Sequence, residues 1–322
     1  MKKSTKILLI TASAFVLAGL MVFAVAMSMV NWDFDRLNNL KYETNTYVIK
    51  EKFDHIHIES KTDDIIFRLS DDGTCKVVCY EQEKMKHLAE VNEKTLEISV
   101  NDTREWYEHI GLFSFDSAQT TVYLPKKSYN SLSINTSTGD IEMPGDFIFN
   151  SISITGSTGD VNCNASSNEL TKIDLSTGNM TINGASSGKM QLCASTGDIR
   201  VESILCKGDL SVDVSTGKVL LSDVKCNSFN SGGSTGDIDL KNLIASQTFS
   251  LERSTGDIIL DGCNAEELFI KTDTGDVTGT LLSDKVFITD TSTGNISVPK
   301  TITGGKCEIT TSTGDIRISI KE

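Results

Sequence analysis

Residues 137–141 read Ser-Thr-Gly-Asp-Ile, and this short segment decides the fold because it returns throughout the rest of the chain. The 322-residue sequence holds ten copies of the motif, with successive copies 19 or 20 residues apart. Thr precedes the glycine in all ten, Ser precedes that Thr in nine, and Asp follows the glycine in seven. So constant a period is the signature of a repeat architecture. The motif glycines are Gly139, Gly159, Gly178, Gly197, Gly217, Gly236, Gly256, Gly275, Gly294 and Gly314.

Apolar and polar residues alternate on both sides of each motif glycine. Positions two and four after the glycine are apolar in nearly every copy, as in Ile199 and Val201, and so are most residues five and seven before it. This alternation is typical of strands with one buried face. A two-stranded unit cannot bury that face alone, but identical units stacked about 4.8 Å apart can. The sequence therefore predicts an all-β fold: a single-stranded parallel β-solenoid (β-helix) of about ten rungs over residues 129–322.

The motif suits a sharp turn between two strands of a rung. Glycine permits the positive φ that such turns often need. Asp and Asn accept hydrogen bonds from nearby backbone N–H groups, and Ser and Thr hydroxyls can bond to the turn backbone or to the next rung. We therefore expect the motif to turn the chain and the glycines to act as structural turn residues.

A calcium ladder is the alternative interpretation of the same motif. Carboxylates in one column about 4.8 Å apart would repel by about 0.9 kcal/mol per neighbouring pair in water, and a hard cation would relieve that. However, the known calcium β-roll repeats a nonapeptide that this motif does not match, and one carboxylate per rung gives few ligands. The structural interpretation is favoured and the calcium-binding β-roll stays open. Its ligands would be Asp140, Asp160, Asp198, Asp237, Asp257, Asp276 and Asp315.

The N-terminal 30 residues differ from the rest. Residues 1–6 are basic, and residues 7–30 carry no charge. A helix of that length is about 36 Å long, enough to cross a bilayer core of about 30 Å. The positive-inside rule keeps Lys2, Lys3 and Lys6 in the cytoplasm, so we expect a single-pass plasma-membrane anchor with the C-terminal domain outside. A cleaved signal peptide ending near Ala24-Val25-Ala26 is the alternative.

Between the anchor and the repeats, residues 31–46 are expected to be a linker and residues 47–128 irregular N-terminal rungs that cap the solenoid. Residues 60–65 resemble a degenerate copy of the turn motif, and residues 81–91 suggest a short helix or a charged loop. Aromatic residues at 106–115, with Trp106 among them, suggest a plug over the solenoid end or an exposed contact site. At the other end, we expect residues 316–320 to be an edge strand that Lys321 and Glu322 protect from pairing.

The eight cysteines are expected mainly to be small buried hydrophobic residues, although exported proteins often form disulfides. Cys206 and Cys226 occupy the same place in adjacent repeats and are the best disulfide candidate. All four histidines lie before the repeats, at His55, His57, His87 and His109, so we expect no metal site apart from the calcium alternative. No cofactor-binding motif occurs either.

The net charge and the absence of known catalytic motifs exclude several classes of function. A net charge of −14 argues against a nucleic-acid partner, which would require clustered Lys and Arg. The acidic residues recur uniformly, so no rung carries a unique catalytic cluster, and none of the common hydrolase or nucleotide-binding motifs is present. We expect the protein not to be an enzyme.

The segment Leu124-Pro-x-x-Ser-Tyr-x-Ser-Leu-x-Ile134, followed by repeated Ser-Thr-Gly-Asp-Ile, resembles the bacterial "putative adhesin" family of β-strand-repeat proteins, which is related to the toastrack-type domains of envelope-stress operons. The resemblance covers roughly residues 47–322. It implies a β-solenoid outside a bacterial membrane, often in Gram-positive bacteria, and it implies no reaction.

Two non-catalytic functions follow. The first is a surface binding or adhesin-like module, because flat faces with ladders of Ser, Thr and Asp suit a repetitive partner such as a cell-envelope glycan, or a membrane or surface protein. The second is a regulatory or scaffold component of a cell-envelope stress response. With a cytoplasmic tail of six residues, that role would require a membrane partner.

Overall fold

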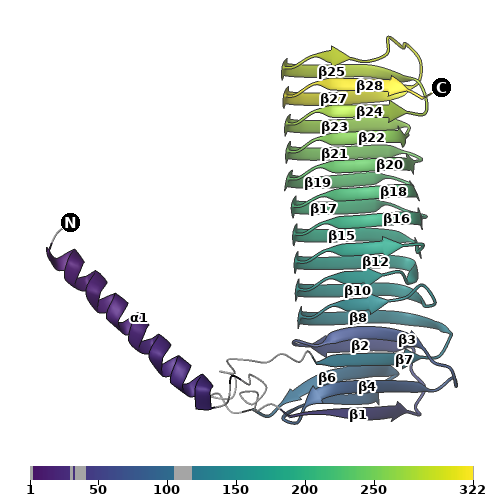
Figure 1. The fold of residues 1–322 in the computed structure, drawn as a ribbon. Helices are drawn as coiled ribbons and strands as arrows, with labels where there is room; N and C mark the ends of the chain where they lie inside the picture. Colours follow the sequence, from purple (N-terminus) through teal and green to yellow (C-terminus); the bar gives the residue numbers. More distant parts are fainter. Residues whose placement is uncertain (1–2, 30–31, 33–40, 105–117, 322) are drawn as a thin grey trace.

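The computed structural model describes residues 3–29, 32, 41–104 and 118–321. It consists of one helix, α1 (Lys3–Met29), and a long stack of short strands (Figure 1). Residues 5–29 within α1 have a mean hydropathy of 2.5, and their described side chains are exposed apart from that of Met27. By length and composition this helix can span a membrane or serve as a signal sequence.

Two sheets form the walls of the solenoid. Sheet A, in spatial order, contains β1 (Tyr42–Ile49), β4 (Cys75–Gln82), β7 (Gln119–Leu124), β3 (Asp64–Leu69), β9 (Ile141–Met143), β11 (Val161–Cys163), β13 (Met180–Asn183), β16 (Ile199–Cys206), β18 (Val219–Cys226), β20 (Ile238–Ala245), β22 (Ile258–Cys263), β24 (Val277–Leu281), β28 (Ile316–Ile320) and β26 (Ile296–Ser297), with β14 (Ser186–Ser187) also paired to β16.

Sheet B, in the opposite direction along the stack, contains β25 (Lys285–Thr293), β27 (Gly305–Thr313), β23 (Glu267–Thr274), β21 (Thr248–Thr255), β19 (Phe229–Thr235), β17 (Leu210–Thr216), β15 (Lys189–Thr196), β12 (Ser166–Thr177), β10 (Ile148–Thr158), β8 (Ser128–Thr138), β2 (His55–Ser60), β6 (Thr95–Asp102) and β5 (Met85–Asn92).

Each repeat contributes one strand to each sheet and pairs in parallel with its copies above and below. Leu192 of β15, for example, lies in register with Ile173 on one side and Val212 on the other. These three side chains are buried, as are their equivalents along the column except Thr289 of the end rung, which is half-buried. The predicted parallel β-solenoid of about ten turns, with continuous apolar columns between its walls, is confirmed.

The motif glycine allows two rungs to touch at the turn. Gly197 has φ +139°, and a Cβ placed on it would lie 2.0 Å from the carbonyl oxygen of Gly178 in the preceding rung. The N–H of Gly197 also donates to the carbonyl oxygen of Thr216 at 3.0 Å. The turn therefore needs glycine for both its backbone conformation and its close approach.

The last two rungs are interchanged. β28, expected to be an edge strand, lies between β24 and β26, and β27 lies between β23 and β25. The inward side chains of this inserted rung (Cys307, Ile309, Ile316, Ile318) are apolar and buried, whereas the end rung places Thr289 in register with Ile309. Inserting the more apolar rung therefore removes more apolar surface from water.

The first rung is the degenerate copy predicted at residues 60–65. Its strands β2 and β3 pair in parallel with β8 and β9, so it occupies the place before the first full motif. Beyond it, antiparallel pairing ends the regular stack: β4 pairs with β1 and β7, and β5 pairs with β6. These strands form the irregular cap, coloured purple and blue in Figure 1.

Two segments of the cap differ from expectation. Residues 81–91 form no helix or loop: β4 and β5 extend through most of them, because Glu81, Met85 and His87 point inward. β1 begins at Tyr42, inside the segment assigned to the linker, and pairs with β4 along its whole length. The aromatic segment around Trp106 lies outside the described residues.

Candidate functional site

The aspartates of the motif join each rung to the next. The N–H of Asp160 donates to Asp140 Oδ1 at 2.8 Å, and the N–H of Asn179 donates to Asp160 Oδ1 at 2.7 Å. Asp64 of the first rung already begins the ladder by accepting the N–H of Asp140 at 2.9 Å. A short side chain with an acceptor oxygen is required for this bond, which explains why Asp and Asn occupy the position.

Lys218 occupies the Asp/Asn position of the motif but cannot make the bond to the next rung. Its N–H donates to Asp198 Oδ1 at 2.8 Å, but its own side chain has no acceptor for the next rung. Instead, its ammonium group lies 3.1 Å from Asp237 Oδ2. The hydrogen bond from Lys218, followed by the N–H of Asp257, holds the pKa of Asp237 below its ordinary value.

The Ser and Thr hydroxyls of the motif do not take part in the turn. Within the described rungs, every one of these side chains is exposed, and none makes a side-chain hydrogen bond to the protein. Three threonines of the repeats that do donate to carbonyl oxygens, Thr136, Thr291 and Thr311, lie two residues before the motif threonine and outside the motif itself. The expectation that the motif hydroxyls bond the turn backbone or the next rung is therefore wrong.

We call these side chains the hydroxyl ladder. It comprises Ser137, Thr138, Ser157, Thr158, Ser176, Thr177, Ser195, Thr196, Ser215, Thr216, Ser234, Thr235, Ser254, Thr255, Thr274, Ser292, Thr293, Ser312 and Thr313. It follows one edge of the solenoid at the spacing of the rungs, about 4.8 Å.

A second set of polar side chains, unlike the exposed hydroxyl ladder, is buried inside the cap. His87 of β5 is 3% exposed, Asp63 in the turn before β3 is 2% exposed, and Glu81 of β4 is fully buried. His87 Nε2 lies 2.8 Å from Asp63 Oδ2, and His87 Nδ1 lies 2.5 Å from Glu81 Oε2. Glu81 Oε2 also accepts the backbone N–H of His87 at 2.6 Å. The imidazole is thus held between two carboxylates.

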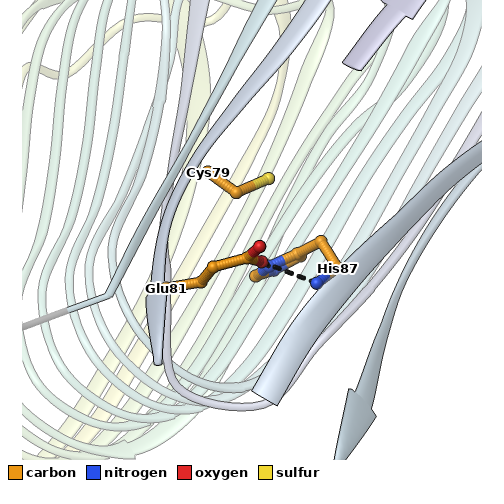
Figure 2. Close-up of side chains that lie close together, drawn as sticks. All are labelled: Cys79, Glu81 and His87. Carbon is orange, nitrogen blue, oxygen red and sulfur yellow. Dashed lines mark hydrogen bonds and ion pairs between the residues drawn. The ribbon is translucent and has the colours of Figure 1, made fainter. Parts of the chain in front are cut away.

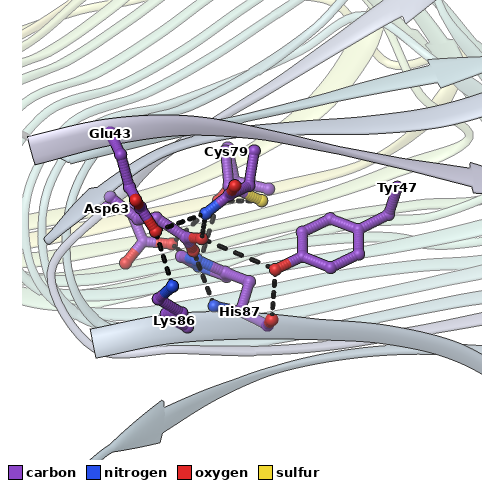
Figure 3. A network of polar contacts seen from close by, with 9 residues as sticks. Glu43, Tyr47, Asp63, Cys79, Lys86 and His87 are labelled. Carbon is purple, nitrogen blue, oxygen red and sulfur yellow. Dashed lines mark hydrogen bonds and ion pairs between the residues drawn. The ribbon is translucent and has the colours of Figure 1, made fainter. Parts of the chain in front are cut away.

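Further groups surround this arrangement (Figure 3). The Thr120 hydroxyl on β7 lies 3.1 Å from both His87 Nε2 and Asp63 Oδ2, and it lies 3.8 Å from Cys79 Sγ. On the other side, Asn45 donates to Glu81 Oε1 at 2.6 Å. We call Asp63, Cys79, Glu81, His87 and Thr120 the cap cluster.

Asp63 and Cys79 govern the protonation of His87. Burial alone would lower its pKa, but the hydrogen bonds to Asp63 and Cys79 and the charge of Asp63 raise the pKa to about 11. Burial likewise opposes ionisation of Asp63, yet the hydrogen bond and charge of His87 hold its pKa below its ordinary value. These contacts therefore favour the protonated form of His87 beside the ionised carboxyl group of Asp63.

A family model for Toastrack DUF4097 matches residues 53–210 and again residues 205–322, which together span the solenoid and most of the cap. The chain belongs to the toastrack family. The predicted family resemblance is thus confirmed, and it rests on the family model.

The solved structures to which this toastrack chain is similar share little sequence with it. A crystal structure named "putative adhesin" from Bacteroides fragilis NCTC 9343 is 15% identical, covers 87% of this chain and 97% of its own, and has a TM-score of 0.44. One of the same name from Parabacteroides distasonis ATCC 8503 is 13% identical over 87% and 98%, with a TM-score of 0.49. A "putative lipid binding protein" from the same strain is 16% identical over 88% and 98%, with a TM-score of 0.36. The comparison with curated proteins finds no match.

The other predicted site residues of this toastrack chain lie along the solenoid. The motif aspartates run along one edge with one carboxylate per rung, and the calcium ladder stays a prediction. Cys206 of β16 and Cys226 of β18 are buried free thiols in neighbouring rungs, and burial raises the pKa of Cys226 to about 12. Their disulfide also stays a prediction.

Sequence reasoning missed the cap cluster. Asp63 and Thr120 are distant in the chain from the other three members, and the five side chains share no column of the repeat. The signal that could have found them is the hairpin of β4 and β5: Cys79 and Glu81 share one face of a strand, and His87 returns opposite them after a two-residue turn. Reading residues 81–91 as a helix or loop hid that pairing.

Proposed function

We propose that this protein is a membrane-anchored, extracytoplasmic, non-catalytic binding module whose partner is a repetitive polymer, with an uncharged cell-envelope glycan as the best fit. The hydroxyl ladder is the observation that carries the proposal. The turn uses the glycine for its conformation and the Asp for its rung-to-rung bond, but it uses neither hydroxyl.

Repetition suits this ladder to a polymer. Hydroxyls can both donate and accept, as glycan hydroxyls do, and each hydrogen bond is worth only about 0.5–1.5 kcal/mol. Many such bonds along a rigid edge add up through high effective concentration. The neighbouring Asp and Asn ladder and the net charge of −14 disfavour an anionic polymer, which is why an uncharged glycan fits best.

The anchor supports an envelope location. The apolar stretch of α1 is long enough to cross a bilayer, and its described side chains are exposed apart from that of Met27. The basic residues before it would stay in the cytoplasm, so the solenoid would extend from the outer face. A non-catalytic role is supported by the position of the cap cluster, whose titratable side chains are enclosed rather than placed in a cleft.

Co-sedimentation of the full chain, in detergent micelles, with insoluble wall glycan tests the proposal. We expect the protein to sediment with the glycan, and soluble glycan fragments to release it. A chain that stays in the supernatant, or that fragments fail to release, would overturn the glycan assignment. Altered stress-promoter output after deletion, with no loss of glycan binding by the envelope, would favour the regulatory alternative.

A further inference from the structure

The cap cluster contains a set of metal-ligand atoms that the solenoid does not need. We propose that it is a closed structural site for a zinc-like transition-metal ion, with His87 Nε2, Cys79 Sγ and Asp63 Oδ2 as ligands and Glu81 as the group that orients His87. This inference is independent of the proposed glycan binding and replaces the expectation that the cap holds no metal.

The geometry of the donors comes first. Cys79, Glu81 and His87 each place a ligand atom within 4.8 Å of the other two (Figure 2). The Thr120 hydroxyl lies within 3.1 Å of His87 Nε2 and of Asp63 Oδ2, and within 3.8 Å of Cys79 Sγ. The three proposed ligands therefore converge around one oxygen, which can complete a four-coordinate set or yield its place to the ion.

The chemistry of the donors points to one class of metal. A thiolate, an imidazole nitrogen and a carboxylate oxygen together favour zinc and its neighbours over calcium and magnesium, which prefer oxygen ligands alone. Structural zinc sites are usually closed and tetrahedral. Cys79, His87, Asp63 and Thr120 are each at most 3% exposed. They come from three different strands and one turn of the cap, so an ion among them would join those elements.

Glu81 occupies the place of an outer-sphere carboxylate. Metal-bound histidines commonly donate their other ring N–H to such a group, which fixes the tautomer and the ring orientation. His87 Nδ1 lies 2.5 Å from Glu81 Oε2, while Asn45 donates to the second oxygen of Glu81 at 2.6 Å. The Tyr47 hydroxyl, which donates to the carbonyl oxygen of His87 at 2.7 Å, holds the same segment. The ring is thus oriented with Nε2 toward Cys79 and Asp63.

Metal binding requires a neutral imidazole nitrogen and a thiolate, so a divalent ion would displace any proton held on His87 Nε2 and on the Cys79 thiol, and those protons would pass to solvent. The carboxyl groups of Asp63 and Glu81 would then offset the charge of the ion inside the cap, which matters because unpaired buried charge is costly. Nearby Glu43 and Lys86 pair with each other at 2.7 Å.

Binding would be coupled to formation of the cap, because the ligands come from separate strands and the site is enclosed. The test therefore uses the full chain produced in detergent with Co²⁺ supplied during folding, under reducing conditions. We expect one cobalt per chain, a thiolate-to-cobalt charge-transfer band, and the intense visible bands of tetrahedral cobalt. Absence of bound metal from folded wild-type protein, or bound cobalt without the charge-transfer band, would overturn the proposal.

Two variants and a matched control sharpen that result. Cys79→Ser keeps the bonds between His87 and both carboxylates but should abolish the charge-transfer band. Glu81→Gln should weaken metal binding about 10–100-fold, as loss of an outer-sphere partner does. Cys263→Ser removes another buried thiol, in the solenoid, and should leave the spectrum unchanged. A charge-transfer band that survives Cys79→Ser would contradict the assignment. None of these changes touches the hydroxyl ladder, so failure here leaves glycan binding unaffected.

Discussion

The solenoid and the cap solve the problem of polar groups in opposite ways. In the solenoid, most motif aspartates accept a backbone N–H from the equivalent residue of the neighbouring rung, so one kind of contact recurs along the stack. In the cap, Asp63 contacts His87 and Thr120, which are 24 and 57 residues away and have no copies. Repeated contacts leave exposed side chains of the same motif free for binding, whereas unique contacts concentrate charge in one enclosed place.

The largest effect should come from breaking the repeat at a turn. Gly197→Ala puts a Cβ 2.0 Å from the Gly178 carbonyl oxygen at φ +139°, so backbone strain and overpacking together should cost about 2–6 kcal/mol. Gly184→Ala is the control, because its φ is also positive but no atom lies within 4 Å of the new Cβ. Urea denaturation followed by circular dichroism measures both. Equal losses would show that conformation alone, and not rung contact, requires the glycine.

The cap should be most sensitive at its histidine. His87→Gln leaves two buried carboxylates without their cation, and such a loss typically costs about 3–5 kcal/mol. Limited proteolysis should then cut the cap while the solenoid persists, since each rung depends mainly on its neighbours. His57→Gln, at a partly exposed position beside Glu59, should change stability by less than about 0.5 kcal/mol. Unchanged resistance of the His87 variant would contradict the ionic network.

The pH dependence of the metal-free wild type provides a second check on His87. Its pKa rises from 6.5 to about 11 on folding, so its stabilisation is complete below pH 6.5 and is lost as pH rises toward 11. The pKa of Asp63 is lowered, so its contribution is lost as pH falls below about 4. His87→Gln should therefore abolish the alkaline loss of cap stability in chelator-treated protein.

One rung of the solenoid resembles the cap in burying a charge. Arg253 is 1% exposed and reaches across Gly233 to donate to the Val214 carbonyl oxygen at 2.7 Å, while its Nε and Nη2 have no partner among the described residues. Burial lowers its pKa. A buried charge without a partner is costly, so Arg253→Met, which removes that charge, should raise the melting temperature or leave it unchanged. A marked loss of stability would contradict this expectation and show that the guanidinium group stabilises the rung.

The smallest effect should come from calcium. The ladder aspartates already accept backbone N–H groups through Oδ1, and one carboxylate per rung offers few further ligands. We therefore expect millimolar calcium to leave the melting temperature of the full chain unchanged. A saturable rise that Asp160→Asn and Asp257→Asn both reduce would instead support the calcium β-roll.

The sequence predicted the repeated part of the fold well, because the column of Ile154, Ile173 and Leu192 is visible as a period in the order of the residues alone. It did not predict that the last rung is inserted. That choice depends on comparing the burial of Ile309 with that of Thr289, a difference between two near-copies rather than a pattern. The cap cluster was not predicted either, because it also follows no repeating pattern. His87 contacts Asp63 only after three strands of the cap have folded together.

The motif itself shows how far such prediction extends. The turn role of Gly197 and the acceptor role of Asp160 follow from general turn chemistry. The same chemistry suggested that the motif hydroxyls would bond to the backbone, and the structure places them in solvent instead. Only the geometry of the stacked rungs distinguishes the motif residues that form the turn, glycine and aspartate, from the motif hydroxyls that are exposed to solvent.

The most direct test of that separation replaces five central threonines of the hydroxyl ladder, Thr177, Thr196, Thr216, Thr235 and Thr255, by valine in the full chain. Valine keeps the shape and favours strands, so the melting temperature should hold, while sedimentation with wall glycan should be lost. The matched Thr→Ser variant keeps the hydroxyls and should sediment as the wild type does. Glycan binding that survives the valine substitutions, or a solenoid that unfolds because of them, would contradict the account.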